Sequence, residues 1–226
     1  MSQAQGDEIY YAHAGKSSFL QNLSGRAREA NHRLFENVMR PTASTTILDV
    51  GVSDEITLES NMLEQKHPHR GQIVCASLGD GHGIVAAYPG IRHQRIEVGK
   101  PLPFRDGEFD IAYSNAVLEH VGCARNQEAF IHELCRVGRR VFIAVPNRLF
   151  PIEHHTALPL VHWLPAPLFR QLMAKTRWHH WSHEENLKHV SPAELRGMFP
   201  KGREARTAYS GLGIGPFRSN LVAFEL

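Results

Sequence analysis

Apolar and polar positions along the chain first follow a helical pattern and then a strand–helix alternation. Residues 16–39 carry apolar side chains at three- and four-residue spacing, which predicts an amphipathic helix that ends before Pro41. From residue 45 onward, short apolar runs rich in β-branched residues alternate with helical segments. The pattern predicts strands over 47–50, 72–76, 92–98, 109–114 and 141–145, and helical segments over 58–66, 84–88 and 126–137.

The strands are short and continuously apolar, which is typical of a mainly parallel sheet covered by helices on both faces. Right-handed crossovers between them give a doubly wound α/β fold. Residues 148–190 interrupt this alternation with many Pro, His and Trp residues, and we expect them to form a cap on the substrate side. A short helix over 192–199 and two closing strands over 205–209 and 221–226 complete the prediction.

Length, charge and cysteine content narrow the function classes. At 226 residues we expect a single domain over 1–226, with a loose tail over 1–15. The net charge of +2 gives no electrostatic case for nucleic acid. The chain shows no secretory signal pattern, and no apolar run approaches the roughly 20 residues of a transmembrane helix. Cys75, Cys123 and Cys135 are scattered, which favours a reducing, cytoplasmic location.

The clearest motif lies within residues 96–147. A Leu-Pro-Phe turn, an Asp-Gly pair, an apolar strand ending in Ser114-Asn115, a helix and a strand closed by Pro146-Asn147 follow one another there. Ligands of open α/β sheets bind beyond the carboxyl ends of the strands. Those ends carry Gly51, Ser77, Gly99 and Ser114-Asn115, so we expect one crevice to form around them.

Together with Asp49-Val50-Gly51 upstream, this motif resembles the class I S-adenosylmethionine (SAM)-dependent methyltransferases, in particular the small type 11 methyltransferase domain. The resemblance covers roughly residues 45–150. It implies a Rossmann-like, seven-stranded sheet with one antiparallel strand, SAM as cofactor and methyl transfer as the activity. It also implies cofactor contacts from Asp49, Gly51, Ser53, Ser77, Leu78, Asp80, Gly99, Leu102, Ser114, Asn115 and Ala116.

The sequence departs from the family pattern at three places. Ser53 and Glu55 stand where the family has further glycines, and Ser53 or Asp54 has the alternative role of a helix cap. The second strand ends without the usual ribose-binding acid, so Asp80 is the nearest carboxylate, with a plain turn as the alternative. No acid directly precedes the Leu-Pro-Phe turn, whose Leu102 can equally belong to the core. We therefore expect modest SAM affinity.

Methyl transfer from an activated donor needs mainly proximity and alignment, and a base only where the acceptor must lose a proton. His120 follows the fourth strand at the lip of the crevice and is the predicted general base. The alternative is a histidine on a helix face that bonds to the backbone. The neighbouring Glu119 is predicted to be structural, as a partner of Arg136 or Arg140.

The segment after the fifth strand is expected to supply a substrate wall from Asn147, Glu153, His155 and His162. Histidines are dense from there to residue 183. No metal site is predicted, because no His-x-x-x-His pair occurs and adjacent histidines on an extended chain point in opposite directions. Ser182 and Glu185 have the spacing of a capping box.

These observations leave two hypotheses for function. The first is a SAM-dependent methyltransferase with a small or medium-sized acceptor, for which a lipid-linked sugar, a polysaccharide precursor and a quinone-like phenol are open. The second is a non-catalytic SAM-fold binding or scaffold module with a degenerate cofactor motif. A nicotinamide-dependent enzyme is disfavoured, because Gly-x-Gly-x-x-Gly is absent after the first strand. The sequence gives no indication of the oligomeric state.

Overall fold

A seven-stranded sheet organises the fold. The computed structural model describes residues 18–57 and 60–226, so the expected tail over 1–15 lies outside the described residues. The strand order is β3-β2-β1-β4-β5-β7-β6, with the first five strands parallel and β7 antiparallel to both of its neighbours. The strands are β1 (Ile47–Val50), β2 (Ile73–Ser77), β3 (Arg92–Arg95), β4 (Phe109–Asn115), β5 (Gly138–Pro146), β6 (Arg206–Ser210) and β7 (Asn220–Phe224). The predicted fold class and the closing hairpin are confirmed.

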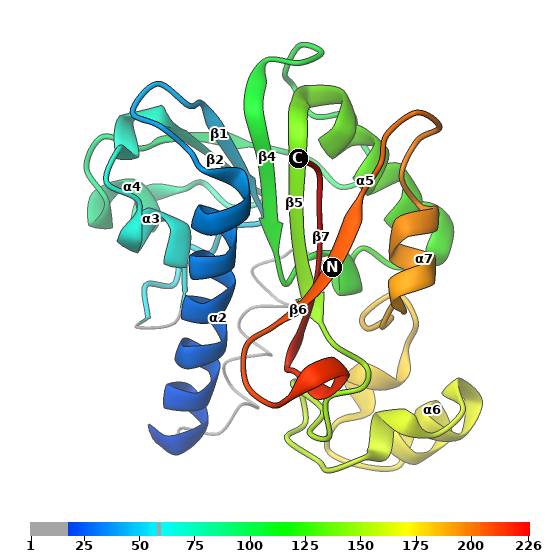
Figure 1. The fold of residues 1–226 in the computed structure, drawn as a ribbon. Helices are drawn as coiled ribbons and strands as arrows, with labels where there is room; N and C mark the ends of the chain where they lie inside the picture. The colour runs from blue at the N-terminus through cyan, green and yellow to red at the C-terminus, as the bar shows by residue number, and fades with distance from the viewer. Residues whose placement is uncertain (1–17, 58–59) are drawn as a thin grey trace.

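Helices cover both faces of this sheet (Figure 1). Alternate residues of a strand face opposite sides, so β1 places Ile47 in one apolar cluster and Leu48 in the other. One cluster includes residues of α2, α3 and α4, and the other includes residues of α5 and α7. The helices are α2 (Ser18–Met39), α3 (Met62–Lys66), α4 (His82–Ala87), α5 (Ala124–Val137), α6 (Ala166–Ala174) and α7 (Pro192–Gly197).

Several element boundaries differ from the predicted ones. Strand β3 ends at Arg95 rather than at residue 98, and it pairs with β2 alone at the edge of the sheet. Strand β5 begins at Gly138, three residues earlier than predicted, because Gly138 already pairs with Phe109 of β4. A Cβ at residue 138 would lie 2.6 Å from the Cβ of Ala112. The close contact between β4 and β5 therefore requires glycine at that position.

Residues 147–190 extend beyond the edge at which β5 ends, at the bottom of Figure 1. They contain α6, two short 3₁₀ helices and a small apolar cluster of their own, built from Phe169, Met173, Trp181 and Leu187. The predicted capping box at Ser182 is wrong, because its hydroxyl donates to the carbonyl of His179 (2.6 Å). A capping box does occur at Ser191 and Glu194, where it begins α7.

Among the helices that the structure describes, none combines the length and the apolar character needed to cross a membrane.

Candidate active site at the carboxyl edge of the sheet

The carboxyl ends of β1, β2 and β4 meet at one edge, because these three strands are adjacent and parallel. The backbone N–H of Gly51 donates to the carbonyl of Ala76 (2.8 Å), and the hydroxyl of Ser114 donates to the carbonyl of Val50 (3.0 Å). Gly51 and Ser114 are therefore brought together as expected, and Ser77 and Asn115 end the strands on either side.

Gly51 has a backbone conformation that favours glycine, with a φ of +100°. A Cβ at this position would lie 2.1 Å from Cγ2 of Val117, a separation far below van der Waals contact. The loop after β1 and the turn after β4 can thus approach each other closely only because residue 51 lacks a side chain. This contact lies at the carboxyl edge of the sheet, where ligands of open α/β sheets bind.

The end of β2 offers a hydroxyl and an imidazole where the family has a carboxylate. Ser77 Oγ lies 2.9 Å from Nε2 of His93, while the exposed carboxylate of Asp80 pairs with Arg95 (3.0 Å). The second strand of a nucleotide-binding sheet ordinarily supplies an acid to the ribose hydroxyls. The strand ends therefore keep the family's glycine at the cofactor edge, whereas a hydroxyl–imidazole pair replaces the ribose acid.

The loop after β1 caps helix α4 and not α3, which is the next helix in the sequence. The carboxylate of Asp54 accepts the N–H groups of Gly81 (2.9 Å) and Ile84 (3.2 Å) at the start of α4. Ser53 is fixed by Asn61, whose amide bonds both its N–H and its carbonyl. Glu55, which stands in place of a family glycine, is exposed.

Two residues predicted to contact the cofactor have their side chains in the interior. Asp49 is 6% exposed and lies beside the fully buried Glu64, which accepts a bond from the thiol of Cys75 (3.2 Å). Burial, reinforced by the negative charge of Glu64, raises the pKa of Asp49 well above its usual value. Leu102 packs in the core beside α5, as the alternative interpretation expected. Gly99 is exposed, with a φ of +72°.

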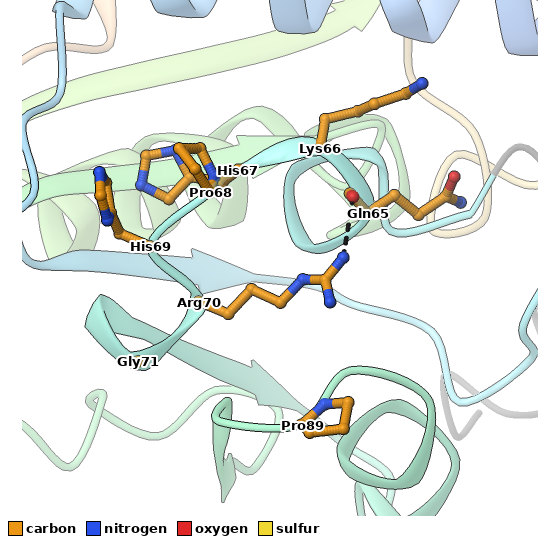
Figure 2. Close-up of a pocket in the computed structure, with 8 residues that line it drawn as sticks. All are labelled: Gln65, Lys66, His67, Pro68, His69, Arg70, Gly71 and Pro89. Carbon is orange, nitrogen blue, oxygen red and sulfur yellow. Dashed lines mark hydrogen bonds between the residues drawn. The ribbon is translucent and has the colours of Figure 1, made fainter.

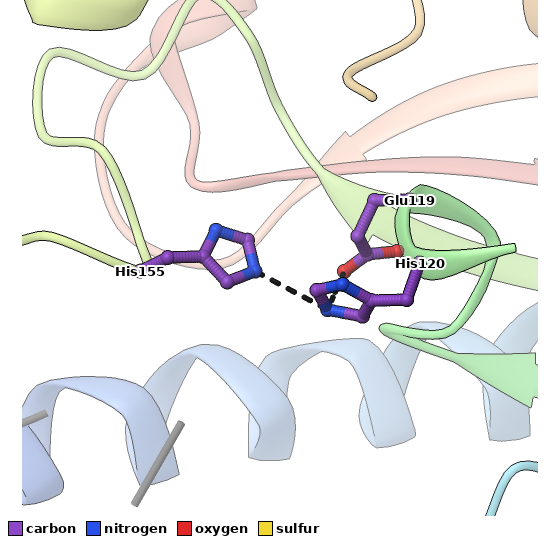
Figure 3. Close-up of side chains that lie close together, drawn as sticks. All are labelled: Glu119, His120 and His155. Atoms are coloured by element: carbon purple, nitrogen blue, oxygen red, sulfur yellow. Dashed lines mark hydrogen bonds and ion pairs between the residues drawn. The ribbon is translucent and has the colours of Figure 1, made fainter. Parts of the chain in front are cut away.

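His120 ends a short 3₁₀ helix (Leu118–His120) directly after β4 (Figure 3). Its Nδ1 lies 2.8 Å from the carbonyl of Asn186, and its Nε2 lies 3.3 Å from Nε2 of His155. Desolvation by the surrounding side chains lowers the pKa of His120, although 35% of its side chain remains exposed. The imidazole is thus held from one side and open to solvent on another.

Glu119 is buried without the arginine partner that the sequence suggested. Arg136 bonds Glu133 and Asp106 instead, and Arg140 donates to the carbonyl of Met39. Neither carboxylate oxygen of Glu119 has a hydrogen-bond partner among the described residues, and its Oε1 lies 3.9 Å from Nε2 of His120. Burial raises the pKa of Glu119. The expected ion pair with Arg136 or Arg140 is therefore wrong.

Glu153 holds His155 from behind. Its Oε1 lies 2.8 Å from Nδ1 of His155 and 3.6 Å from Nε2 of His189, while its Oε2 accepts the N–H groups of His155 and Thr156. Burial acts to raise the pKa of Glu153, but its interactions with His155 and His189 bring that pKa well below its usual value. His189 was not predicted as a site residue. It is far from Glu153 in the sequence, and only the folding of the chain brings the two side chains together.

Asn147 and His162, the other two residues of the predicted substrate wall, form hydrogen bonds to the backbone of neighbouring loops. Asn147 donates to the carbonyls of Pro216 (2.8 Å) and Arg218 (2.6 Å), and its own carbonyl oxygen accepts the N–H of Leu149. The Nε2 of His162 bonds the carbonyl of Phe150 (2.8 Å). Asn147 also borders a hollow of about 350 Å³, whose lining includes Leu149, Trp163, Val190 and Pro192.

A larger hollow of about 520 Å³ lies at the opposite edge of the sheet (Figure 2). Its lining residues, Gln65–Gly71 and Pro89, precede β2 and β3, so they lie at the amino ends of these strands. This hollow is therefore separate from the cofactor edge.

Comparison with known proteins gives a match to one family model. Residues 56–141 match the family model described as a methyltransferase domain. No curated protein matches the chain by sequence.

Solved structures similar to the whole chain include a SAM-dependent methyltransferase from Aquifex aeolicus (TM-score 0.56, 11% identity, 97% of this chain and 96% of that chain covered). Another, from Mesorhizobium loti, has a TM-score of 0.53 at 17% identity and covers 86% of this chain and 97% of its own. A third is the magnesium protoporphyrin IX methyltransferase of Synechocystis with bound S-adenosylhomocysteine (0.59, 14%, 98% and 94%). These similarities show that the chain has the fold of the SAM-dependent methyltransferases, and that its residues 56–141 match the methyltransferase domain model.

Proposed function

We propose that this protein transfers a methyl group from SAM to a small or medium-sized acceptor bound between the carboxyl edge of the sheet and residues 148–190. The supporting observation is the short path from Ser114-Asn115 to His120 at the end of β4, beside Gly51. This path joins the expected contact with the methionine part of SAM to the expected acceptor side. These residues lie at the carboxyl ends of the strands, which is where ligands of open α/β sheets bind.

The cofactor would be held mainly by backbone. Gly51 and the segment Ser114–Ala116 would receive the amino-acid end, and Ala116 supports a tight turn there with a φ of +59°. Ser77 and His93 would face the ribose hydroxyls. The buried side chain of Asp49 would not touch the cofactor directly, and would contribute by holding the end of β1 in place. Contacts from the remaining predicted residues, which are Ser53, Leu78, Asp80, Gly99 and Leu102, stay part of this proposal.

The reaction is an in-line displacement. Bound SAM supplies a methyl group that is already activated by its sulfonium sulfur, so the chain has to align the acceptor and exclude water. Nε2 of His120 would take the proton that a hydroxyl or ammonium acceptor loses. Of the proposed substrate wall, Glu153 and His155 lie next to His120, whereas Asn147 and His162 would act by shaping the loops.

Lipid-linked sugars, polysaccharide precursors and quinone-like phenols all offer hydroxyl groups that His120 can serve. A cytoplasmic location belongs to the same proposal, because all three cysteines are free.

The second hypothesis, a SAM-fold scaffold without turnover, is favoured by one observation. Asp80 pairs with Arg95 on the exposed edge of the sheet, so the ribose hydroxyls lose their usual carboxylate. Weak cofactor binding would follow.

Two measurements separate these functions. Calorimetric titration with SAM and S-adenosylhomocysteine tests cofactor binding, and transfer of a radiolabelled methyl group to host extract and to the three acceptor classes tests turnover. Binding together with transfer supports the enzyme. Binding without transfer to any acceptor supports the scaffold, and the absence of heat at millimolar SAM excludes both.

A further inference from the structure

Two histidine rings face each other across the acceptor side of the site (Figure 3). Nε2 of His120 and Nε2 of His155 are 3.3 Å apart. The Nδ1 of His120 lies against a backbone carbonyl, which can only accept, so this nitrogen carries the hydrogen. Glu153, ionised because its other oxygen accepts two backbone N–H groups, holds the hydrogen on Nδ1 of His155 in the same way. Both Nε2 atoms therefore present lone pairs in the neutral rings.

A buried carboxylate completes the cluster. Glu119 is fully enclosed, and both of its oxygens lack a hydrogen-bond partner within the described part of the chain. One carboxylate oxygen of Glu119 and one ring nitrogen each of His120 and His155 all lie within 4.8 Å of one another. A proton shared by the two rings would satisfy them but would leave Glu119 unsatisfied, and an unpaired buried carboxylate is costly. A cation among the three groups satisfies all of them.

The spacing fits a small tetrahedral ion. Ligand atoms about 2.0–2.1 Å from zinc lie roughly 3.3–3.4 Å apart in a tetrahedron. The two imidazole nitrogens, at 3.3 Å, already have this separation, and Oε1 of Glu119, at 3.9 Å from Nε2 of His120, has to move about 0.5 Å closer to it. The partial exposure of His120 leaves a route from solvent and a side for a fourth ligand.

The rings are also fixed in the manner of metal-binding histidines. Such a histidine commonly donates its second N–H to a carboxylate or a backbone carbonyl, which sets the tautomer and the ring orientation. Glu153 does this for His155, and the carbonyl of Asn186 does it for His120.

We propose that Glu119, His120 and His155 bind a divalent transition-metal cation of the zinc type, through one carboxylate oxygen and two Nε2 atoms. Two imidazoles and a carboxylate suit Zn²⁺ and Co²⁺ better than Mg²⁺, which prefers oxygen ligands. A neighbouring group, Glu153, His155 and His189, also has ligand spacing. It is the poorer site, because Glu153 already accepts two backbone N–H groups and the N–H of His155.

This inference goes beyond the proposed function and revises one part of it. Nε2 of His120 cannot hold a cation and the proton of the acceptor at the same time. With the cation bound, an acceptor hydroxyl in the fourth position would lose its proton to solvent water more readily because of the positive charge. That last consequence rests on the proposed function, whereas binding of the cation does not.

The test uses the full chain without a histidine tag, treated with a chelator and dialysed. Titration with Zn²⁺ is followed by calorimetry, Co²⁺ by its visible absorption, and the bound metal is counted by elemental analysis. We expect one equivalent of Zn²⁺, a tetrahedral Co²⁺ spectrum and no comparable binding of Mg²⁺. Glu119→Gln, which keeps the size of the side chain, and His155→Ala should each weaken Zn²⁺ binding at least tenfold.

His132→Ala is the matched control, because this histidine lies on the exposed face of α5 near Glu128, away from the cluster. It should bind Zn²⁺ like the unmodified chain. Circular dichroism confirms the fold of each variant, and Glu119→Gln decides the matter if His155→Ala fails to fold. Unchanged affinity in Glu119→Gln overturns the proposal, as does the absence of stoichiometric Zn²⁺. Loss of binding in His189→Ala with retention in Glu119→Gln also overturns it, by assigning the metal to the neighbouring group. Because no step requires SAM or an acceptor, failure here leaves the methyl transfer proposal standing, and the converse holds.

Discussion

The side chain of Val117 fills the space that any side chain at Gly51 would need, with its Cγ2 2.1 Å from the position of a Cβ there. This contact joins the loop after β1 to the turn after β4, the two segments beside which the cofactor is proposed to bind. The positive φ of Gly51 adds a second reason for glycine.

Gly51→Ala should therefore lower the free energy of unfolding by more than about 2 kcal/mol and abolish SAM binding, because steric clash and backbone strain act together. Adding Val117→Ala should recover only part of the stability, since it removes the clash but not the strain. Urea denaturation measures both changes. Gly197→Ala is the control, because a Cβ there meets nothing within 4 Å. Equal stability of the Gly51 and Gly197 variants would contradict the close approach.

Much of the carboxyl edge of the sheet can be predicted from the sequence, because short local patterns determine where its strands end. The doubly wound pattern predicts that Gly51 and Ser114 lie at neighbouring strand ends. Strand β1 begins and ends where it was predicted. Boundaries of the outer strand β3 were less predictable, since its exposed side chains give no periodic signal.

The histidine cluster was not predictable from spacing. His120 and His155 are 35 residues apart, and their contact depends on how residues 147–190 fold back onto the end of β4. Adjacent histidines on an extended segment point in opposite directions, but this rule concerns ligands from one segment only. Glu119 was given an arginine partner because charged groups are rarely buried alone, and the structure shows a buried carboxylate beside imidazoles instead.

His120→Ala should reduce turnover at least tenfold while leaving SAM affinity unchanged. The imidazole faces the acceptor side, whereas the proposed SAM contacts at Gly51 and Ser114–Ala116 are mainly backbone. Steady-state methyl transfer and SAM calorimetry on the same preparation give the two numbers, with His132→Ala as the control. Full turnover by His120→Ala would exclude both a base and an acceptor-activating cation at this position.

The buried pair Asp49 and Glu64 should make the fold less stable as pH rises. Burial raises the pKa of both carboxyl groups, Asp49 also through the charge of Glu64, so the folded chain keeps protons that the unfolded chain has lost. The free energy of unfolding therefore falls with pH above the ordinary values of 3.8 and 4.5, until the folded pKa values are passed.

Glu64→Gln should flatten this fall, because it removes one of the two ionising groups and keeps an acceptor for the thiol of Cys75. Relative to the unmodified chain, the variant gains stability as pH rises from about 5 to about 8. Urea denaturation at several pH values measures the difference. Glu128→Gln, on the exposed surface of α5, is the control and should give a curve parallel to that of the unmodified chain. A parallel curve for Glu64→Gln would show that Glu64 does not titrate in this range.

Asn147 should matter for stability more than for acceptor specificity. The residue is 2% exposed, and two of its three hydrogen bonds join the end of β5 to the loop before β7. Asn147→Ala leaves two carbonyls and one N–H without this partner, so the unfolding free energy should fall by about 1–3 kcal/mol. Denaturation measures the loss, and the ratio of turnover between two acceptors measures specificity. His179→Ala, at an exposed position within residues 147–190, is the control. A changed acceptor ratio with unchanged stability would instead assign Asn147 to direct contact with the substrate.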